Sequence, residues 1–116
     1  DEKAEKIARS NSIMTAYRYL ASAIKKGPGL EIMKDDLDIE DSEIGDDYFI
    51  NNLVIAGSVE TVLQRILGLI DDVGTFGTLI NMSFDWIDDS DRRSWMESMA
   101  LFQTELMPSL NKALDN

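Results

Sequence analysis

The stretch that decides the fold reads Phe76-Gly77-Thr78-Leu79-Ile80-Asn81-Met82-Ser83-Phe84-Asp85-Trp86. Within it, residues 77–82 form a short run of β-branched and apolar side chains, which predicts a buried strand. A strand needs neighbours for its backbone hydrogen bonds, and residues 53–56 are the one other candidate. Because a two-stranded sheet is marginal in water, the strand is predicted to belong to a sheet larger than this chain.

Helices are predicted on both sides of this strand and at the start of the chain. The first spans about 1–26, where apolar residues recur at helical spacing before Gly27-Pro28-Gly29 stops the helix. The second follows Ser58 as its N-cap and ends at Gly74. The third begins near residues 88–91 and should kink or end at Pro108. The chain as it stands is therefore predicted to be mainly α, with about three main helices and one or two short strands.

The loop after the predicted strand supplies the candidate site. In parallel α/β folds, ligands bind at the carboxyl ends of the strands, so Ser83, Phe84 and Asp85 are predicted to lie at a cofactor or substrate mouth. Trp86 is expected to pack beneath them. The alternative is that Asp85 only caps the following turn. No catalytic residue is assigned.

Composition excludes several functions. The chain has 116 residues, which suits a single segment or domain, and it contains neither Cys nor His. Disulfides, thiol nucleophiles, Cys/His zinc sites and imidazole chemistry are therefore excluded within it. The net charge of −11 argues against partners such as nucleic acid or anionic membrane. No apolar run is long enough to span a bilayer, and we expect a cytoplasmic protein.

The acidic residues gather in an excursion at 30–52. Eight acidic side chains and no basic one occur between positions 35 and 47. A calcium loop starting at Asp36 would need Gly at its sixth position and Glu at its twelfth, but those positions are Asp41 and Asp47. The excursion is therefore interpreted as a solvated acidic segment, and no metal site is predicted.

Gly57-Ser58, which opens the second predicted helix, permits two interpretations. Free amides at a helix start can hold a phosphate, and the Ser58 oxygen can instead cap the helix. Plain capping is the favoured interpretation.

Four motifs in order resemble a known family. They are Gly57-Ser58-Val59-Glu60, Phe76-Gly77-Thr78-Leu79, Phe84-Asp85-Trp86 and Leu106-Met107-Pro108. Together they resemble the C-terminal end of the bacterial luciferase-like, flavin-dependent monooxygenases, in the branch with limonene and alkanal monooxygenase-like proteins. The resemblance spans the chain, although residues 27–52 match poorly.

The resemblance implies that 1–116 is a single C-terminal segment of a (β/α)8 TIM barrel. The parent enzyme would bind reduced FMN, delivered by a separate reductase, and use oxygen to oxidise a small organic substrate. The isolated chain would be inactive and would associate with copies of itself through its uncovered apolar faces. Two residues depart from the family pattern: Val59 stands where Pro is usual, and Phe84 stands where His is usual. The second departure puts any polar contact from that position in doubt.

The alternative is a stand-alone acidic helical module that binds a basic partner protein. Its support is the acidic excursion and the lack of catalytic residue types. The native mass would distinguish the two, because a barrel enzyme has about 35–45 kDa and this chain alone has 13.0 kDa.

Overall fold

The structure is a computed structural model that describes residues 1–81 and 86–115. Helices dominate this part of the chain and no strand occurs in it, which confirms the prediction of a mainly α chain. Its α-helices are α1 (Glu2–Ser10), α2 (Ser12–Lys26), α3 (Asp46–Tyr48), α4 (Val59–Val73), α5 (Asp89–Leu101) and α6 (Met107–Leu114). Short 3-10 helices lie at Leu30–Met33 and Asp41–Glu43, and π-helical turns lie at Phe49–Leu53 and Phe102–Leu106.

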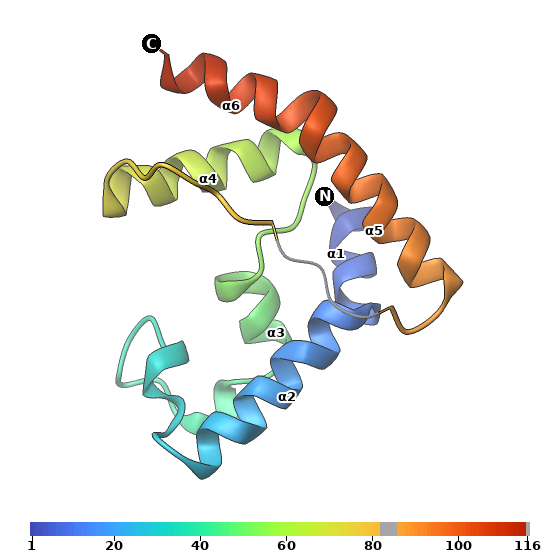
Figure 1. The fold of residues 1–116 in the computed structure, drawn as a ribbon. Coiled ribbons are helices and arrows are strands. Elements are labelled where there is room, and N and C mark those ends of the chain that lie inside the picture. Colours follow the sequence, from blue (N-terminus) through green and yellow to red (C-terminus); the bar gives the residue numbers. More distant parts are fainter. Residues whose placement is uncertain (82–85, 116) are drawn as a thin grey trace.

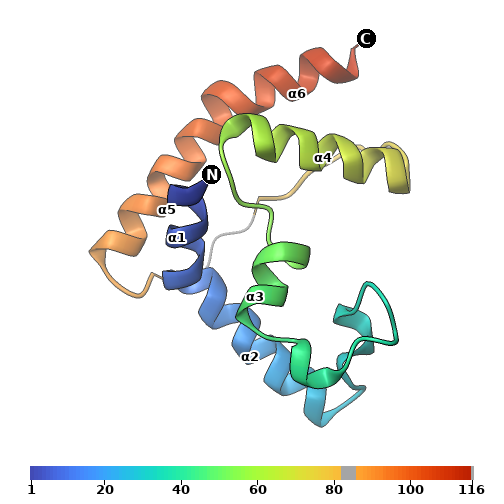
Figure 2. The ribbon, with the colours of Figure 1, turned by 180° about the vertical axis from the view of Figure 1, so that it is seen from behind.

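The helices fall into two groups, which Figure 1 and Figure 2 show from opposite sides. One group holds α1, α2 and α3 together with the acidic excursion, and the other holds α4 and α6. α5 continues into α6 as one long curved rod (Figure 1). A buried hydrogen bond ties this rod to the first group, because the Trp95 indole Nε1 donates to Ser12 Oγ at 2.8 Å.

The single helix predicted over 1–26 is wrong, because the helix breaks at Asn11. This residue has an extended backbone, and its Oδ1 accepts from the backbone N of Ile13 at 3.0 Å. Short polar side chains compete for backbone hydrogen bonds, so they favour caps over helix interiors. The break lets α2 start in a new direction, and it buries Ser12 and Met14.

The first core lies between α2 and the segment that follows it. Phe49 is 2% exposed and stacks on Tyr17, with ring centroids 5.6 Å apart. Phe49 is the first residue of the π-helical turn Phe49–Leu53. The buried members of this core are Ala8, Met14, Leu30, Met33, Tyr48, Phe49, Ile50 and Val54.

The second core joins α4 to α6 through Ile66, Leu106 and Leu110. The predicted ends of α4 are confirmed. Ser58 Oγ accepts from the backbone N of Thr61 at 3.2 Å, and Gly74 ends the helix with a φ of 85°.

The last helix passes through Pro108 with a local change of winding. Proline has no N–H and clashes with the carbonyl one turn earlier, so a regular α-helix would be disrupted there. The chain adopts a π turn instead, in which the Met107 N–H bonds to the Phe102 carbonyl. Pro108 therefore bends the rod and does not end it.

The strand expected at 77–82 does not form over residues 77–81, the part that the structure describes. These residues are irregular, as are residues 54–57. A strand needs a neighbouring strand for its backbone hydrogen bonds, and neither segment has such a neighbour among the described residues. The (β/α)8 parent barrel stays a prediction.

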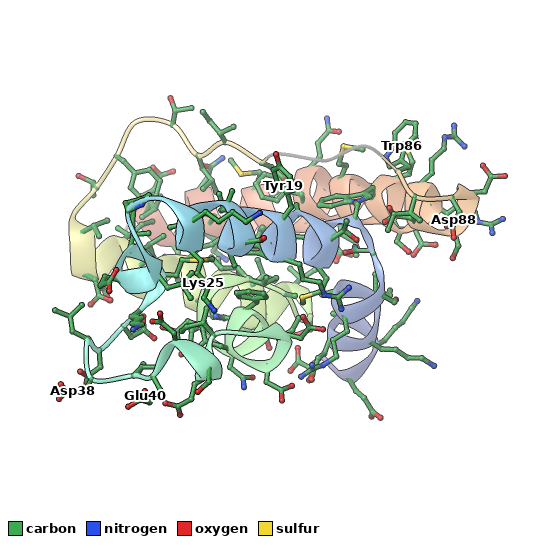
Figure 3. All side chains as sticks on the ribbon, turned by 90° about the horizontal axis from the view of Figure 1, so that it is seen from below. Tyr19, Lys25, Asp38, Glu40, Trp86 and Asp88 are labelled. Carbon is green, nitrogen blue, oxygen red and sulfur yellow. The ribbon has the colours of Figure 1, made fainter. Side chains whose placement is uncertain are left out.

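Ion pairs fix the acidic excursion internally and join it to α1 and α2. Lys34 Nζ lies 2.7 Å from Asp41 Oδ1, and Arg18 forms two hydrogen bonds with Asp46. These hydrogen bonds lower the pKa of the Asp41 and Asp46 carboxyls below the usual range. Asp38 and Glu40 lie at the outer edge of the excursion in Figure 3. The segment thus carries both solvated and paired acids.

The molecule exposes more surface than a compact domain of its length. Its accessible surface is 8164 Å², whereas about 6,300 Å² is expected for a compact protein of this mass. The Cα radius of gyration is 15.3 Å, compared with about 13 Å for a compact domain. The excess of about 1,800 Å² follows from the open arrangement of the two helix groups.

Candidate functional site

The predicted mouth residues Ser83, Phe84 and Asp85 lie outside the described residues. The neighbouring Trp86 is described and is 49% exposed. The Arg92 guanidinium carbon lies 5.5 Å from the centroid of the Trp86 ring, which is a cation–π distance. Figure 3 shows Trp86 close to Asp88, at the start of α5.

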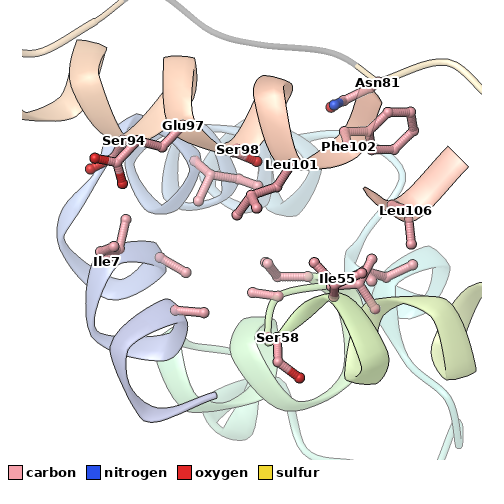
Figure 4. A pocket seen from close by; sticks show the side chains of 18 of the residues that line it. Ile7, Ile55, Ser58, Asn81, Ser94, Glu97, Ser98, Leu101, Phe102 and Leu106 are labelled. Atoms are coloured by element: carbon pink, nitrogen blue, oxygen red, sulfur yellow. The ribbon is translucent and has the colours of Figure 1, made fainter. Parts of the chain in front are cut away.

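A cavity of about 520 Å³ lies between the two helix groups (Figure 4). Its walls come from α1, the segment 54–58, α4, residues 79–81 and α5. Most of the lining side chains are apolar, including Ile7, Ile55 and Leu101. Polar side chains reach it from several elements, including Asp1 and Lys3 at the start of the chain and Ser94 and Glu97 in α5. A cavity of this size and lining is of the kind that binds apolar molecules or apolar chain segments.

One edge of the cavity is the N-terminus of α4, where a carboxylate is bound. Asp1 Oδ1 accepts from the Ser58 backbone N at 2.6 Å, and Asp1 Oδ2 accepts from Thr61 Oγ1 at 3.0 Å. A negative group is favoured there by the free amides and the helix dipole. Gly57 permits this approach, since a Cβ on it would lie 2.7 Å from Thr61 Cγ2 and 2.9 Å from Asp1 Oδ1. The geometry supports capping, and the negative group bound there is the Asp1 carboxylate of the chain itself.

Residues 54–58 are also fixed at their first residue, Val54. The Val54 N–H donates to the Phe49 carbonyl at 2.8 Å, and Arg65 Nη1 donates to the Val54 carbonyl at 2.9 Å. Residues 54–58, which line the cavity, are thus held at both ends.

A buried polar residue in α5 was missed by the sequence analysis. Asp91 is 6% exposed, and its Oδ2 accepts from the Ile87 backbone N at 3.0 Å. Its Oδ1 has no hydrogen-bond partner in the part of the chain that the structure describes. The sequence shows Asp91 only as one of several acids at a helix start, where Asp88 supplies the cap at 2.8 Å.

The described residues do not fit FMN. A flavin phosphate carries negative charge and needs basic or free amide partners. The charged side chains that line the cavity are Asp1, Lys3 and Glu97, which sum to a negative charge. The Ser58 amide is already bound to Asp1. An FMN site would therefore need groups from outside the described residues.

The described residues offer neither a metal-binding cluster nor a membrane-spanning helix. Residues 1–81 and 86–115 contain no group of three or more acidic, His or Cys side chains that could hold a metal ion. Over the same residues, no helix combines the length and the apolar character that crossing a membrane requires.

The chain is similar in sequence to two monooxygenases of Pseudomonas putida. The 2,5-diketocamphane 1,2-monooxygenase 2 is 31% identical over 114 residues, which cover 95% of this chain and 31% of that protein. The 3,6-diketocamphane 1,6-monooxygenase is 24% identical over 111 residues, which cover 95% of this chain and 29% of that protein. The chain thus spans less than a third of the length of these curated relatives. No family model and no solved structure matches it.

Both relatives are named as monooxygenases. Neither relative is named as a limonene or alkanal monooxygenase, so they do not support the narrower branch.

Proposed function

We propose that this chain is the C-terminal third of a luciferase-like, FMN-dependent monooxygenase. The observation that carries the proposal is the similarity to two monooxygenases along 95% of the chain but only 29% and 31% of theirs. The excess exposed surface supports it independently, because a part of a larger fold leaves surface uncovered that the remainder would bury.

In the proposed parent, a (β/α)8 barrel binds reduced FMN from a separate reductase and a small organic substrate in the cytoplasm. Reduced FMN supplies two electrons, one atom of oxygen enters the substrate and the other leaves as water. The flavin would be held largely by residues outside these 116, in agreement with the poor fit of the cavity to FMN. The isolated chain is accordingly proposed to be inactive.

The test is oxygenation by the full-length native protein. It would be incubated with reduced FMN, oxygen and a bicyclic diketone, the substrate type named for the two relatives. The expected result is a product with one added oxygen atom, which comes from ¹⁸O₂ by mass spectrometry. A native protein of 13.0 kDa would contradict the proposal and favour the stand-alone acidic module.

The mouth of the proposed site is assigned to Ser83, Phe84 and Asp85. Replacing Asp85 with Ala in the full-length protein should lower turnover or flavin affinity and leave the melting temperature nearly unchanged. If only the melting temperature falls, Asp85 is a turn cap and the assignment is wrong.

We further propose that the isolated chain associates with itself. Large apolar side chains such as Val73 and Ile80 are 66% and 74% exposed, and uncovered apolar surface drives association. Light scattering should show a mass that rises with concentration. A strict monomer at high concentration would contradict this.

A further inference from the structure

Asp91 is a buried carboxylate with one of its two oxygens unused. The residue is 6% exposed, although the molecule as a whole is open. Its Oδ2 accepts from the Ile87 backbone N at 3.0 Å, whereas its Oδ1 has no hydrogen-bond partner among residues 1–81 and 86–115. An oxygen that leaves water without gaining a donor destabilises a fold, and a charged one does so most. Asp91 therefore needs a donor that the described part of the chain does not supply.

A second buried charge in the chain shows which kind of donor is missing. The Lys34 side chain is also 6% exposed, and its Nζ lies 2.7 Å from Asp41 Oδ1. No ion pair of the described residues includes Asp91, and the adjacent Arg92 lies over the Trp86 ring. The dipole of α5 offsets part of the Asp91 charge, but it adds no donor at Oδ1. Because aspartates are rarely buried unless they are paired, the missing group is a basic side chain.

Asp91 also lies where a fixed carboxylate would steady the proposed mouth. Ile87 follows the segment that carries the mouth residues, and Asp91 holds its N–H. Asp91 is fixed in turn, because its own N donates to Asp88 Oδ1 at 2.8 Å. One helical turn later, the Trp95 indole donates to Ser12 Oγ at 2.8 Å, which holds this side of α5 against the start of α2. Side chains that are held in this way keep neighbouring functional groups in place.

We propose that Asp91 is a positioning residue of the oxygenation site. Its Oδ2 holds the Ile87 N–H, and its Oδ1 forms a buried ion pair with an Arg or Lys side chain from polypeptide outside these 116 residues. This inference rests on the proposed function, which supplies that polypeptide, because the two relatives have more than two thirds of their length outside the matched region. The ion pair joins the remainder of the parent to the point where the mouth segment meets α5. Asp91 contacts neither flavin nor substrate in this role.

Asp91→Asn tests the ion pair, because Asn keeps the shape of the side chain and loses its charge. The amide oxygen of Asn can still accept from the Ile87 N–H, and its NH₂ then takes the place of Oδ1, where it repels a basic partner. Asp89→Asn is the matched control, because Asp89 lies in the same first turn of α5 and is exposed. Both variants would be made in the isolated chain and in the full-length native protein, and urea unfolding would be measured without FMN.

The expected result differs between the two proteins. In the isolated chain, D91N should change the equilibrium constant for unfolding by less than about threefold, because no ion pair is lost. In the full-length protein, D91N should raise this constant at least about tenfold, whereas D89N should change it by less than about threefold.

Three results would overturn the ion pair. The first is a full-length protein in which D91N has no larger effect than D89N. The second is an equally large loss in the isolated chain, because the donor would then lie within the 116 residues. The third is a loss that appears only when FMN is bound, because the donor would then be the ligand.

A kinetic measurement separates positioning from stability alone. At a temperature at which full-length D91N is folded by circular dichroism, its kcat should be at least about tenfold lower than that of D89N, because small displacements of a site slow the reaction. An unchanged kcat in the folded variant would overturn the positioning role.

The same variants separate this inference from the proposed function. A full-length protein that D91N destabilises but that does not oxygenate its substrate contradicts the flavin enzyme and supports the ion pair. One that oxygenates its substrate and tolerates D91N contradicts the inference alone.

Discussion

Replacing Phe49 with Ala should be among the most damaging single changes to the first core. Phe49 is 2% exposed, so its side chain removes about 200 Å² of apolar surface from water, worth about 5 kcal/mol at about 25 cal/mol per Å². Ala keeps part of this burial, but the substitution leaves a cavity and removes the stacking on Tyr17. The expected loss of unfolding free energy is about 3–5 kcal/mol.

The assay is urea unfolding of the isolated chain, followed by far-ultraviolet circular dichroism. Phe76→Ala is the matched control, because the Phe76 side chain is 42% exposed and its loss should cost less than about 1 kcal/mol. If F49A costs no more than F76A, the first core does not hold the chain together as described.

Three further predictions concern the cap, the ion pairs and the flavin. Gly57→Ala should lower the free energy of unfolding by about 1–3 kcal/mol and the melting temperature with it, because the added Cβ would meet Thr61 and Asp1. Gly77→Ala is the control in the same thermal unfolding measurement: nothing lies within 4 Å of its added Cβ, so the melting temperature should not change. Hydrogen bonds lower the folded-state pKa of Asp41 and Asp46. The ion pairs of these two carboxylates therefore stabilise the fold fully above the unfolded-state pKa of about 3.9, and this stabilisation is lost as the pH falls through the lower folded-state pKa. Amide NMR signals of the acidic excursion should therefore shift at that acid pH before those of the second core. The isolated chain should bind FMN with a dissociation constant weaker than about 1 µM, that is, less than about 8 kcal/mol of binding free energy; tighter binding in a fluorescence titration would refute the fragment interpretation.

The features that the sequence predicts well are local ones. Ser58, Gly74 and Asp88 end or begin helices through contacts within four residues of themselves, so residue type and position suffice. The apolar periodicity of α4 likewise predicts a packed face, and the structure shows that this face contacts α6.

The features that the sequence does not predict depend on distant partners. The contact of Trp95 with Ser12 spans 83 positions, and that of Asp1 with Ser58 spans 57. Asn11, where the helix breaks, is one of several polar residues in a helical pattern, and no signal in a single sequence distinguishes it from the others. Residues 77–81 show the opposite case, because their sequence favours a strand but no strand in the described part of the chain pairs with them.

The π turn at Phe102–Leu106 has a consequence for how the long rod serves two cores. In a regular α-helix, Trp95 and Leu106 are eleven residues apart and would share one face, because 3.6 residues complete a turn. The extra residue of a π turn rotates everything after it by about 100°. Trp95 can therefore face Ser12 while Leu106 packs in the second core with Ile66. In evolutionary terms, the turn is equivalent to a one-residue insertion that re-aims half of a helix without a loop, and deleting one residue there would turn α6 away from α4.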